Sequence, residues 1–235
     1  MDDKGVTPMT QRNMTISLVQ SVYNELLSDL AANRRQAGDR LVEAVIARQR
    51  EVSRTPVREA LGRLENDGLI ESVPPNGYVI ITPTIEDIRE IFAIRRALEP
   101  LAFSGLIEVA SANDDTELRS LLSNVQAAHT PEDAATANIF FRNFWMSRIQ
   151  NRRLKETLSR FHMQVHLVRA ATLKLSSGRE TARIGAGKLA ESYWARDTDA
   201  AQDAMTQFVD AALATFEAVA AEKEMAQEPL PKLTG

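Results

Sequence analysis

The sequence contains no cysteine. This absence excludes disulfide bridges, thiolate zinc sites and cysteine nucleophiles, and it is compatible with a reducing cytoplasm. No apolar run approaches the roughly 18 residues that a membrane-spanning helix needs. The N-terminal stretch MDDKGVTPMTQRN also lacks the apolar core of a secretory signal. We therefore expect a cytoplasmic protein with no membrane partner, in which residues 1–11 form a disordered leader and residues 224–235 a flexible tail.

Charge is distributed unevenly along the chain. The formal net charge is −4 and the isoelectric point is about 5.5, which taken alone argues against a nucleic-acid partner. Between Leu30 and Arg63, however, eight arginines accompany only four acidic residues. A solvated helix surface would explain such a segment as well as DNA binding would, so the charge needs support from other features. The arginines are Arg34, Arg35, Arg40, Arg48, Arg50, Arg54, Arg58 and Arg63.

The first third of the chain reads as three helices followed by a hairpin. Apolar residues recur at helical spacing in each of the three segments, and Gly68 ends the third. The motif PPNG then joins two short strands, and Asn-Gly is a strong hairpin signal because both residues tolerate positive φ. This order predicts a winged helix-turn-helix over residues 12–82. The expected helices cover 14–32, 41–49 and 54–67, and the expected strands cover 69–73 and 78–82.

The remainder of the chain contains no strand pattern. Thr84 can cap a new helix with Asp87 three residues on, which resembles a capping box. Helical periodicity then continues to about residue 223 and predicts an all-α antiparallel bundle over residues 83–223. The fold class is therefore mainly α, with the winged helix-turn-helix followed by this bundle. The expected bundle helices cover 84–110, 114–128, 131–149, 151–175, 181–196 and 198–223.

The third helix separates a core face from an outward face. At 100° per residue, one side carries only apolar residues, and Arg58 lies on the other side with Arg54 beside it at the helix start, after Ser53 as N-cap. A helix of this kind fits the major groove, where arginine can bind guanine O6 and N7. The alternative is that Arg54 and Arg58 are solvated or pair with Glu51 and Glu59. The core side comprises Val57, Ala60, Leu61 and Leu64, and the outward side comprises Thr55, Arg58, Gly62 and Asn66.

The stretch VSRTPVREAL, continued by LENDGLI and a glycine-containing wing, resembles the DNA-binding domain of GntR-superfamily transcription regulators. The following EDIREIFAIRRALEPLA resembles the start of the FCD effector domain of the FadR-like branch. This resemblance implies a dimeric, ligand-responsive DNA-binding protein, usually a repressor. It implies DNA contacts at Ser53, Arg54, Thr55 and Arg58. The wing tip, Asn76 and Gly77, is expected to approach the backbone of the neighbouring DNA.

Two departures from the family pattern stand out. The turn of the helix-turn-helix usually carries glycine where this chain has Glu51, and a positive φ there would cost about 1 kcal/mol. Many FCD domains bind a divalent metal through one Asp and three His, and none of those four positions holds such a ligand here. We therefore expect no metal and no cofactor. The corresponding residues are Asn138, Arg142, Ala186 and Phe208.

Asn138, Arg142 and Trp145 lie on one helical face, at positions i, i+4 and i+7. Because arginine offers a planar fork that matches a carboxylate or phosphate, we expect Arg142 to bind an anionic effector. The resemblance implies that Arg95 faces the same pocket, and His166 is expected to line it. The alternative is that Arg142 forms a salt bridge with Glu191 or another acid and holds the bundle together.

These features predict a sequence-specific transcription regulator, in most such cases a repressor, that binds double-stranded operator DNA as a homodimer. A small organic acid in the helical domain would control its DNA binding. The alternative is a winged helix joined to a helical interaction module without a small-molecule effector. No combination of nucleophile, base and orienting residue is present, so we do not expect an enzyme.

Overall fold

The computed structural model describes residues 8–31, 34–35, 38–75, 77–81 and 83–227. The chain divides into two compact units, Met1–Pro83 and Thr84–Gly235, which are considered separately. Helix α1 begins at Pro8 and helix α10 ends at Gln227, so helix covers part of both the expected leader and the expected tail. The rest of the leader and tail, and Asn76 of the wing, lie outside the described residues.

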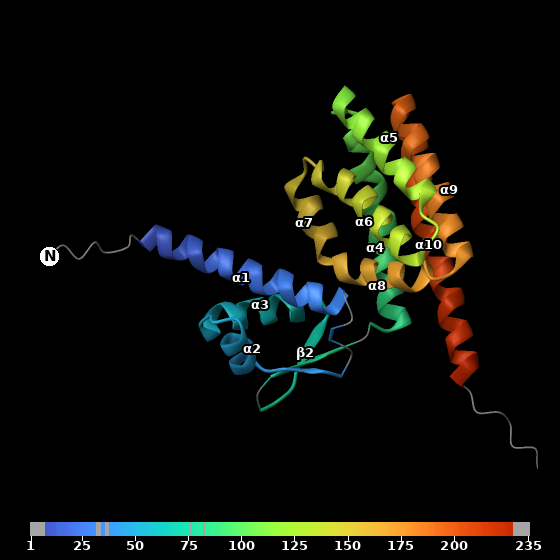
Figure 1. Ribbon diagram of the computed structural model, residues 1–235. Helices are drawn as coiled ribbons and strands as arrows, with labels where there is room; N and C mark the ends of the chain where they lie inside the picture. Colours follow the sequence, from blue (N-terminus) through green and yellow to red (C-terminus); the bar gives the residue numbers. More distant parts are fainter. Residues whose placement is uncertain (1–7, 32–33, 36–37, 76, 82, 228–235) are drawn as a thin grey trace, which may run out of the picture. The chain divides into compact units, whose positions relative to one another are not determined.

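The first unit is a winged helix-turn-helix (Figure 1). Its three strands form an antiparallel sheet in the order β1-β3-β2, and Arg40 of β1 pairs with Val79 of β3. Strand β1 was not expected, because a strand of two residues is too short to show an alternating pattern. The elements are α1 (Pro8–Ala31), β1 (Arg40–Leu41), α2 (Glu43–Gln49), α3 (Arg54–Asn66), β2 (Ile70–Ser72) and β3 (Tyr78–Ile80).

The core of this unit lies between α1 and α3. Helix α1 contributes apolar residues to this core at spacings of three and four positions, so they lie on one face of the helix. The four apolar residues predicted for the core side of α3 are fully buried, which confirms the predicted helix face. At one edge of the core the Tyr23 hydroxyl donates a hydrogen bond of 2.5 Å to Asp67, which fixes α1 against the end of α3. The buried residues are Val19, Val22, Leu26, Val57, Ala60, Leu61 and Leu64.

Several turns of this unit use positive φ, among them the turns at Glu51 and Gly77. Glu51, between α2 and α3, has φ 54°, so the strain expected at this position is present. In the wing, Gly77 has φ 122°, and a Cβ there would lie 2.9 Å from the carbonyl oxygen of Leu41. Only glycine therefore fits at Gly77 without a shift of the neighbouring strand.

The second unit is an all-α bundle (Figure 1). Helices α4 and α9 both pack along α10, and α5 packs on α6 and α9. The predicted capping box is confirmed: the Thr84 hydroxyl accepts from the Asp87 amide, and the Asp87 carboxylate accepts from the Thr84 amide. The helices are α4 (Ile85–Ile107), α5 (Ala112–Ala127), α6 (Pro131–Ser147), α7 (Arg152–Arg160), α8 (His162–Thr172), α9 (Ser176–Ala195) and α10 (Thr198–Gln227).

The bundle differs from the expected helix limits at two places. The single helix expected over 151–175 is divided at Phe161 into α7 and α8. Helix α9 starts at Ser176, so it includes residues 176–180, which fell between two expected helices. Gly178 is needed there, because a Cβ would lie 2.1 Å from the carbonyl oxygen of Thr172. That glycine lets the first turn of α9 lie against the end of α8.

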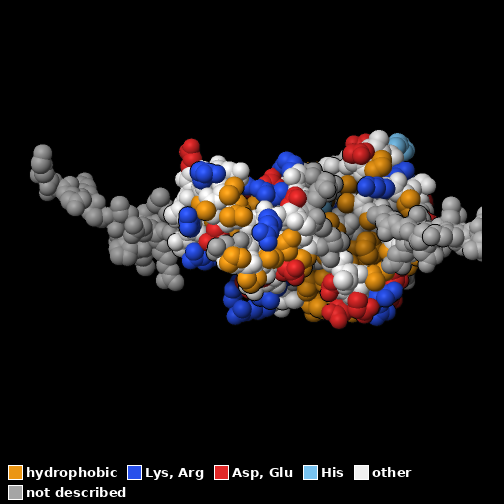
Figure 2. Space-filling model, turned by 90° about the horizontal axis from the view of Figure 1, so that it is seen from below, with side chains coloured by type: hydrophobic (Ala, Val, Ile, Leu, Met, Phe, Trp, Pro, Cys, Tyr) orange, Lys and Arg blue, Asp and Glu red, His pale blue; other side chains and the backbone are white. Residues whose placement is uncertain are grey.

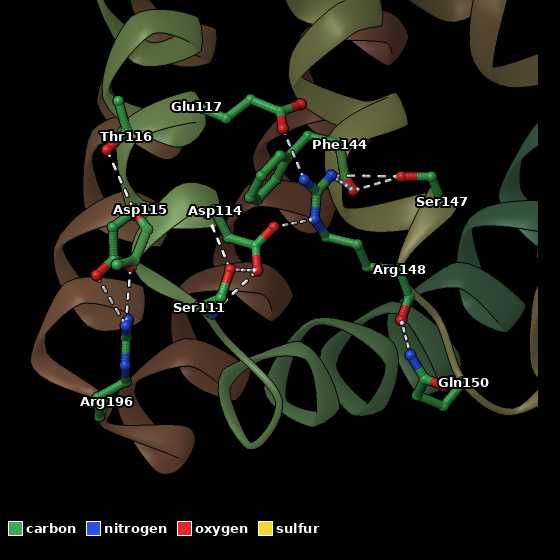
Figure 3. A network of polar contacts seen from close by, with 11 residues as sticks. Ser111, Asp114, Asp115, Thr116, Glu117, Phe144, Ser147, Arg148, Gln150 and Arg196 are labelled. Atoms are coloured by element: carbon green, nitrogen blue, oxygen red, sulfur yellow. Dashed lines mark hydrogen bonds and ion pairs between the residues drawn. The ribbon is translucent and has the colours of Figure 1, made fainter.

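A polar network joins the start of α5 to the ends of α6 and α9 (Figure 3). The Arg148 guanidinium donates to Asp114 and to Glu117, each at 2.7 Å, and to the carbonyl oxygen of Phe144 at 2.9 Å. Arg196 binds both oxygens of Asp115, at 2.8 and 2.9 Å. These ion pairs, together with the Asp114 capping box at Ser111, fix three helix ends at one position of the bundle.

Candidate nucleic-acid interface and ligand cavity

Helix α3 presents its N-terminal turn to solvent. Ser53 occupies the N-cap position with extended backbone, but its hydroxyl makes no capping hydrogen bond and stays available for other partners. Ser53, Arg54, Thr55 and Arg58 are all exposed, so the structure brings these predicted contact residues together at one helix end. Backbone N–H groups and hydroxyls at a helix start are suited to phosphate oxygens.

Arg58 is held by a carboxylate from the preceding helix. Its Nε and Nη2 donate to the Glu43 carboxylate, with the closest distances both 3.0 Å. The partner is thus Glu43 rather than Glu59, the residue considered from the sequence. The side chain of Arg58 remains 66% exposed, and its hydrogen bonds to Glu43 raise its pKa. Side-on pairing leaves Nη1 without a partner among the described residues, so one end of the fork can still bind a base.

The basic segment is only partly available to DNA. Arg34, Arg35 and Arg50 all pair with Asp29 at the end of α1. Arg54, by contrast, is exposed and has no acidic partner among the described residues. Figure 2 shows separate Lys and Arg side chains on the visible face of the first unit, with hydrophobic and uncharged surface between them. The surface therefore offers a few separated cationic contacts and no continuous basic patch on this face.

The helical unit encloses a cavity between five helices. The cavity volume is about 60 Å³, within a larger space of about 630 Å³ between the walls that includes open solvent. Arg95, Asn138, Arg142 and Trp145 all line it, as the sequence suggested, whereas His166 is not among the lining residues. The remaining walls are mostly apolar. They comprise Phe92, Phe141, Val165, Val168, Thr172, Leu173, Gly178, Thr181, Ala182, Phe208, Ala212 and Thr215, together with Arg169.

Glu99 forms a buried ion triad with two of the cavity arginines. Its carboxylate accepts from Nε of Arg95 at 2.7 Å and from Nη1 of Arg142 at 2.8 Å, and it is only 1% exposed. Burial by itself would raise the pKa of Glu99, but the charges of Arg142 and Arg95 hold that pKa down, at about 2. Arg142 thus has an acidic partner, which is Glu99 rather than Glu191, and yet its Nη2 is buried without any hydrogen-bond partner.

Arg169 on α8 was missed by the sequence reasoning. It is 7% exposed and its Nε donates to the amide oxygen of Asn138 at 2.6 Å. No acidic residue of the described chain pairs with it. Burial, with the nearby charges of Arg142 and Arg95, lowers its pKa to about 9. The available signal was its position four residues after Val165, on the buried face of α8.

The comparison with known families decides the identity of the fold. The family described as "Bacterial regulatory proteins, gntR family" matches residues 18–80, and the FCD domain matches residues 90–211. The chain belongs to the GntR family, with an FCD domain. Among curated relatives, the Bacillus subtilis HTH-type transcriptional regulator YdhC is 32% identical over 63% of this chain and 67% of its own length. Escherichia coli McbR is 32% identical over 54% of this chain and 57% of its own length.

Solved structures support the same fold. E. coli McbR/YncC superposes with a TM-score of 0.69 at 22% identity, over 89% of this chain and 99% of that one. A GntR regulator from Rhodococcus gives a TM-score of 0.67 at 23% identity, over 86% and 98% of the two chains. This GntR regulator is therefore mainly α, with a winged helix-turn-helix and a helical FCD unit, as the sequence predicted. Among the described residues, no helix combines the length and apolar character needed to cross a bilayer.

The metal site of many FCD domains does not fit this GntR regulator. The oxygen of Asn138 already accepts from Arg169, and Arg142 is cationic. Ala186 is fully buried, Phe208 lines the cavity, and neither side chain offers a ligand atom. No group of three or more metal-ligating side chains occurs in the described part of the chain. The expectation that the protein works without a metal stays a prediction, supported by a cavity whose charge repels cations.

Proposed function

We propose that this GntR regulator is a cytoplasmic, non-enzymatic homodimer that represses transcription from operator DNA under the control of a small anionic metabolite in the helical cavity. The observation that supports an anionic effector is the environment of Arg142. Its Nη2 is buried in the cavity wall and has no hydrogen-bond partner. A buried donor of this kind costs free energy unless something accepts from it. A carboxylate oxygen would satisfy it and would also offset the positive charge around it.

Dimerisation is supported by an exposed apolar stripe on α4. Ile94 and Leu101 are 39% and 58% exposed, and Ala93 and Ala97 are exposed on the same side of the helix. Exposed apolar residues at spacings of three, four and seven form one helix face, which is suited to packing against a second helix. A second copy of the chain would cover this face and would set the distance between two DNA-reading helices.

The repressor role is supported by relatives. The Bacillus subtilis gluconate operon transcriptional repressor and the E. coli repressor RspR are 32% and 33% identical to this chain over parts of its length. The effector would act by binding one dimer geometry more tightly than the other. It can shift the DNA-binding equilibrium only by the difference between those two affinities.

Footprinting on the region upstream of the protein's own gene tests this function. We expect two protected half-sites related by a dyad, and an affinity that falls steeply between about 50 and 200 mM salt, because phosphate contacts release counterions. Sedimentation of the DNA-free protein should give a dimer, and Leu101→Asp should shift it toward monomer. If the wild type and Leu101→Asp both sediment as monomers, the proposed dimer is contradicted. If the protein is instead a helical interaction module that does not read DNA, the footprint will show no protected region.

A further inference from the structure

The cavity carries more positive charge than its own acid neutralises. The guanidinium groups of Arg95, Arg142 and Arg169 line it, and Glu99 is the acid in contact with the first two. The lining residues from α9 and α10 are glycine, alanine, threonine and phenylalanine, which add no charge. Three cationic groups and one anionic group leave an excess of two positive charges, and buried charges are normally paired.

The excess is concentrated at two arginines from different helices. Arg142, on α6, uses Nη1 for Glu99 and has no partner for Nη2. Arg169, on α8, uses Nε for the neutral Asn138, and its Nη atoms bond no described residue. Arg95 differs from both, because its Nε and Nη2 are paired side-on with the two Glu99 oxygens. Two separate donor groups, one per arginine, are thus left for a ligand.

The rest of the wall defines what lies between two such anionic groups. Phe92, Phe141, Val165, Val168 and Phe208 surround the arginines with apolar surface, which suits a short carbon skeleton. Gly178, in the first turn of the 20-residue helix α9, also lines the cavity.

We propose that the ligand is a small dianion, with one anionic group bound by Arg142 and the second by Arg169. This inference rests on the proposed anionic effector and narrows it from any carboxylate to a species with two negative charges. A dicarboxylate and a phosphate share this chemistry. Asn138 is a positioning residue in this arrangement, because it fixes Nε of Arg169 and leaves the other end of the fork for the ligand.

Isothermal titration calorimetry of the full-length chain with matched probes tests whether the ligand carries two negative charges. Succinate and glutarate are compared with succinamate and glutaramate, which have nearly the same shape and one charge less. We expect the dianions to bind at least about tenfold more tightly, because each adds a charge-assisted pair. Inorganic phosphate is tested separately. If phosphate binds more tightly than both diacids, and if this binding is lost in the Arg169 variant, the dianion belongs to the phosphate class.

Arg169→Gln separates this inference from the proposed function. We expect it to bring the dianions to the affinity of their monoamides and to change the monoamide affinities less than about threefold. Arg153→Gln, which removes an arginine that is 82% exposed on α7, is the matched control and should change neither. Circular dichroism melting confirms that each variant is folded. Asn138→Ala should lower the affinity for the dianions by part of the loss seen in Arg169→Gln, and should leave the affinity for the monoamides unchanged.

Two results would overturn the inference while leaving anion control intact. One is equal affinity for the diacids and their monoamides in the wild type. The other is an Arg169→Gln variant that loses both probe classes equally or neither. Absence of heat with every probe would overturn the proposed anionic effector as well.

Discussion

Glu99→Ala is expected to lower the free energy of unfolding of the helical unit by about 3–5 kcal/mol, because it leaves buried guanidinium groups without their counter-charge. Glu99 is 1% exposed and touches both Arg95 and Arg142. Urea unfolding followed by circular dichroism measures the change. Glu156→Ala is the control: this acid pairs with Arg152 and is 48% exposed, so we expect a change within about 0.5 kcal/mol.

The same carboxylate makes stability depend on pH in one direction. The pKa of Glu99 is about 2 in the folded protein, below that of an unfolded glutamate at about 4.3. Its stabilising contribution is therefore present above the unfolded value and is lost as the pH falls through the folded value. Glu99→Gln should flatten the stability profile in this acidic window. An alanine variant as stable as the wild type would contradict the buried triad.

Arg58→Ala is expected to weaken operator binding about tenfold to a hundredfold, if Arg58 reads a guanine through the free end of its fork. Fluorescence anisotropy with the footprinted operator measures this loss. Arg63→Ala is the control, since Arg63 lies on the same helix but bonds Gln20 of α1. Both variants lose one charge, so only the loss beyond that of Arg63→Ala reports on reading of a base.

Glu43 gives this experiment a second arm. Because Glu43 holds Nε and Nη2 of Arg58, Glu43→Gln should leave the arginine in place and loosen its orientation. We expect a smaller loss of operator affinity than for Arg58→Ala, concentrated on discrimination at one base pair. Unchanged operator affinity in Arg58→Ala would show that α3 has been assigned the wrong role.

Local features of the fold were predictable because local sequence determines them. The core face of α3 follows from apolar spacing, and the capping box at Thr84 needs only one residue three positions on. The family's glycine at the position of Glu51 indicated that a positive φ would be strained there, and φ is positive. Strand β1 was missed because pairing with β3 determines it, and the division at Phe161 was missed because packing within the bundle determines it. Neither cause produces a periodic pattern in the sequence.

The cavity was predicted only in part, for a related reason. Arg142 and Asn138 were found because they occupy two of the family's metal-ligand positions and share one helix face, and Arg95 because the family resemblance implied it. Glu99 was missed because an acid four residues after Arg95 reads as an ordinary surface pair until the bundle buries it. Arg169 was missed because its partner, Asn138, lies 31 residues away on another helix. Ion clusters built across helices are tertiary features, and a single sequence does not reveal them.

The central claim is that anions in the cavity control operator binding, and one titration tests it most directly. Operator affinity is measured by anisotropy for the wild type and for the double variant Arg142→Gln, Arg169→Gln, with and without the dianion that binds most tightly. We predict that the anion changes the operator affinity of the wild type at least about fivefold and leaves that of the double variant unchanged. Equal responses of the two proteins, or no response of the wild type to an anion that fills its cavity, would contradict the account.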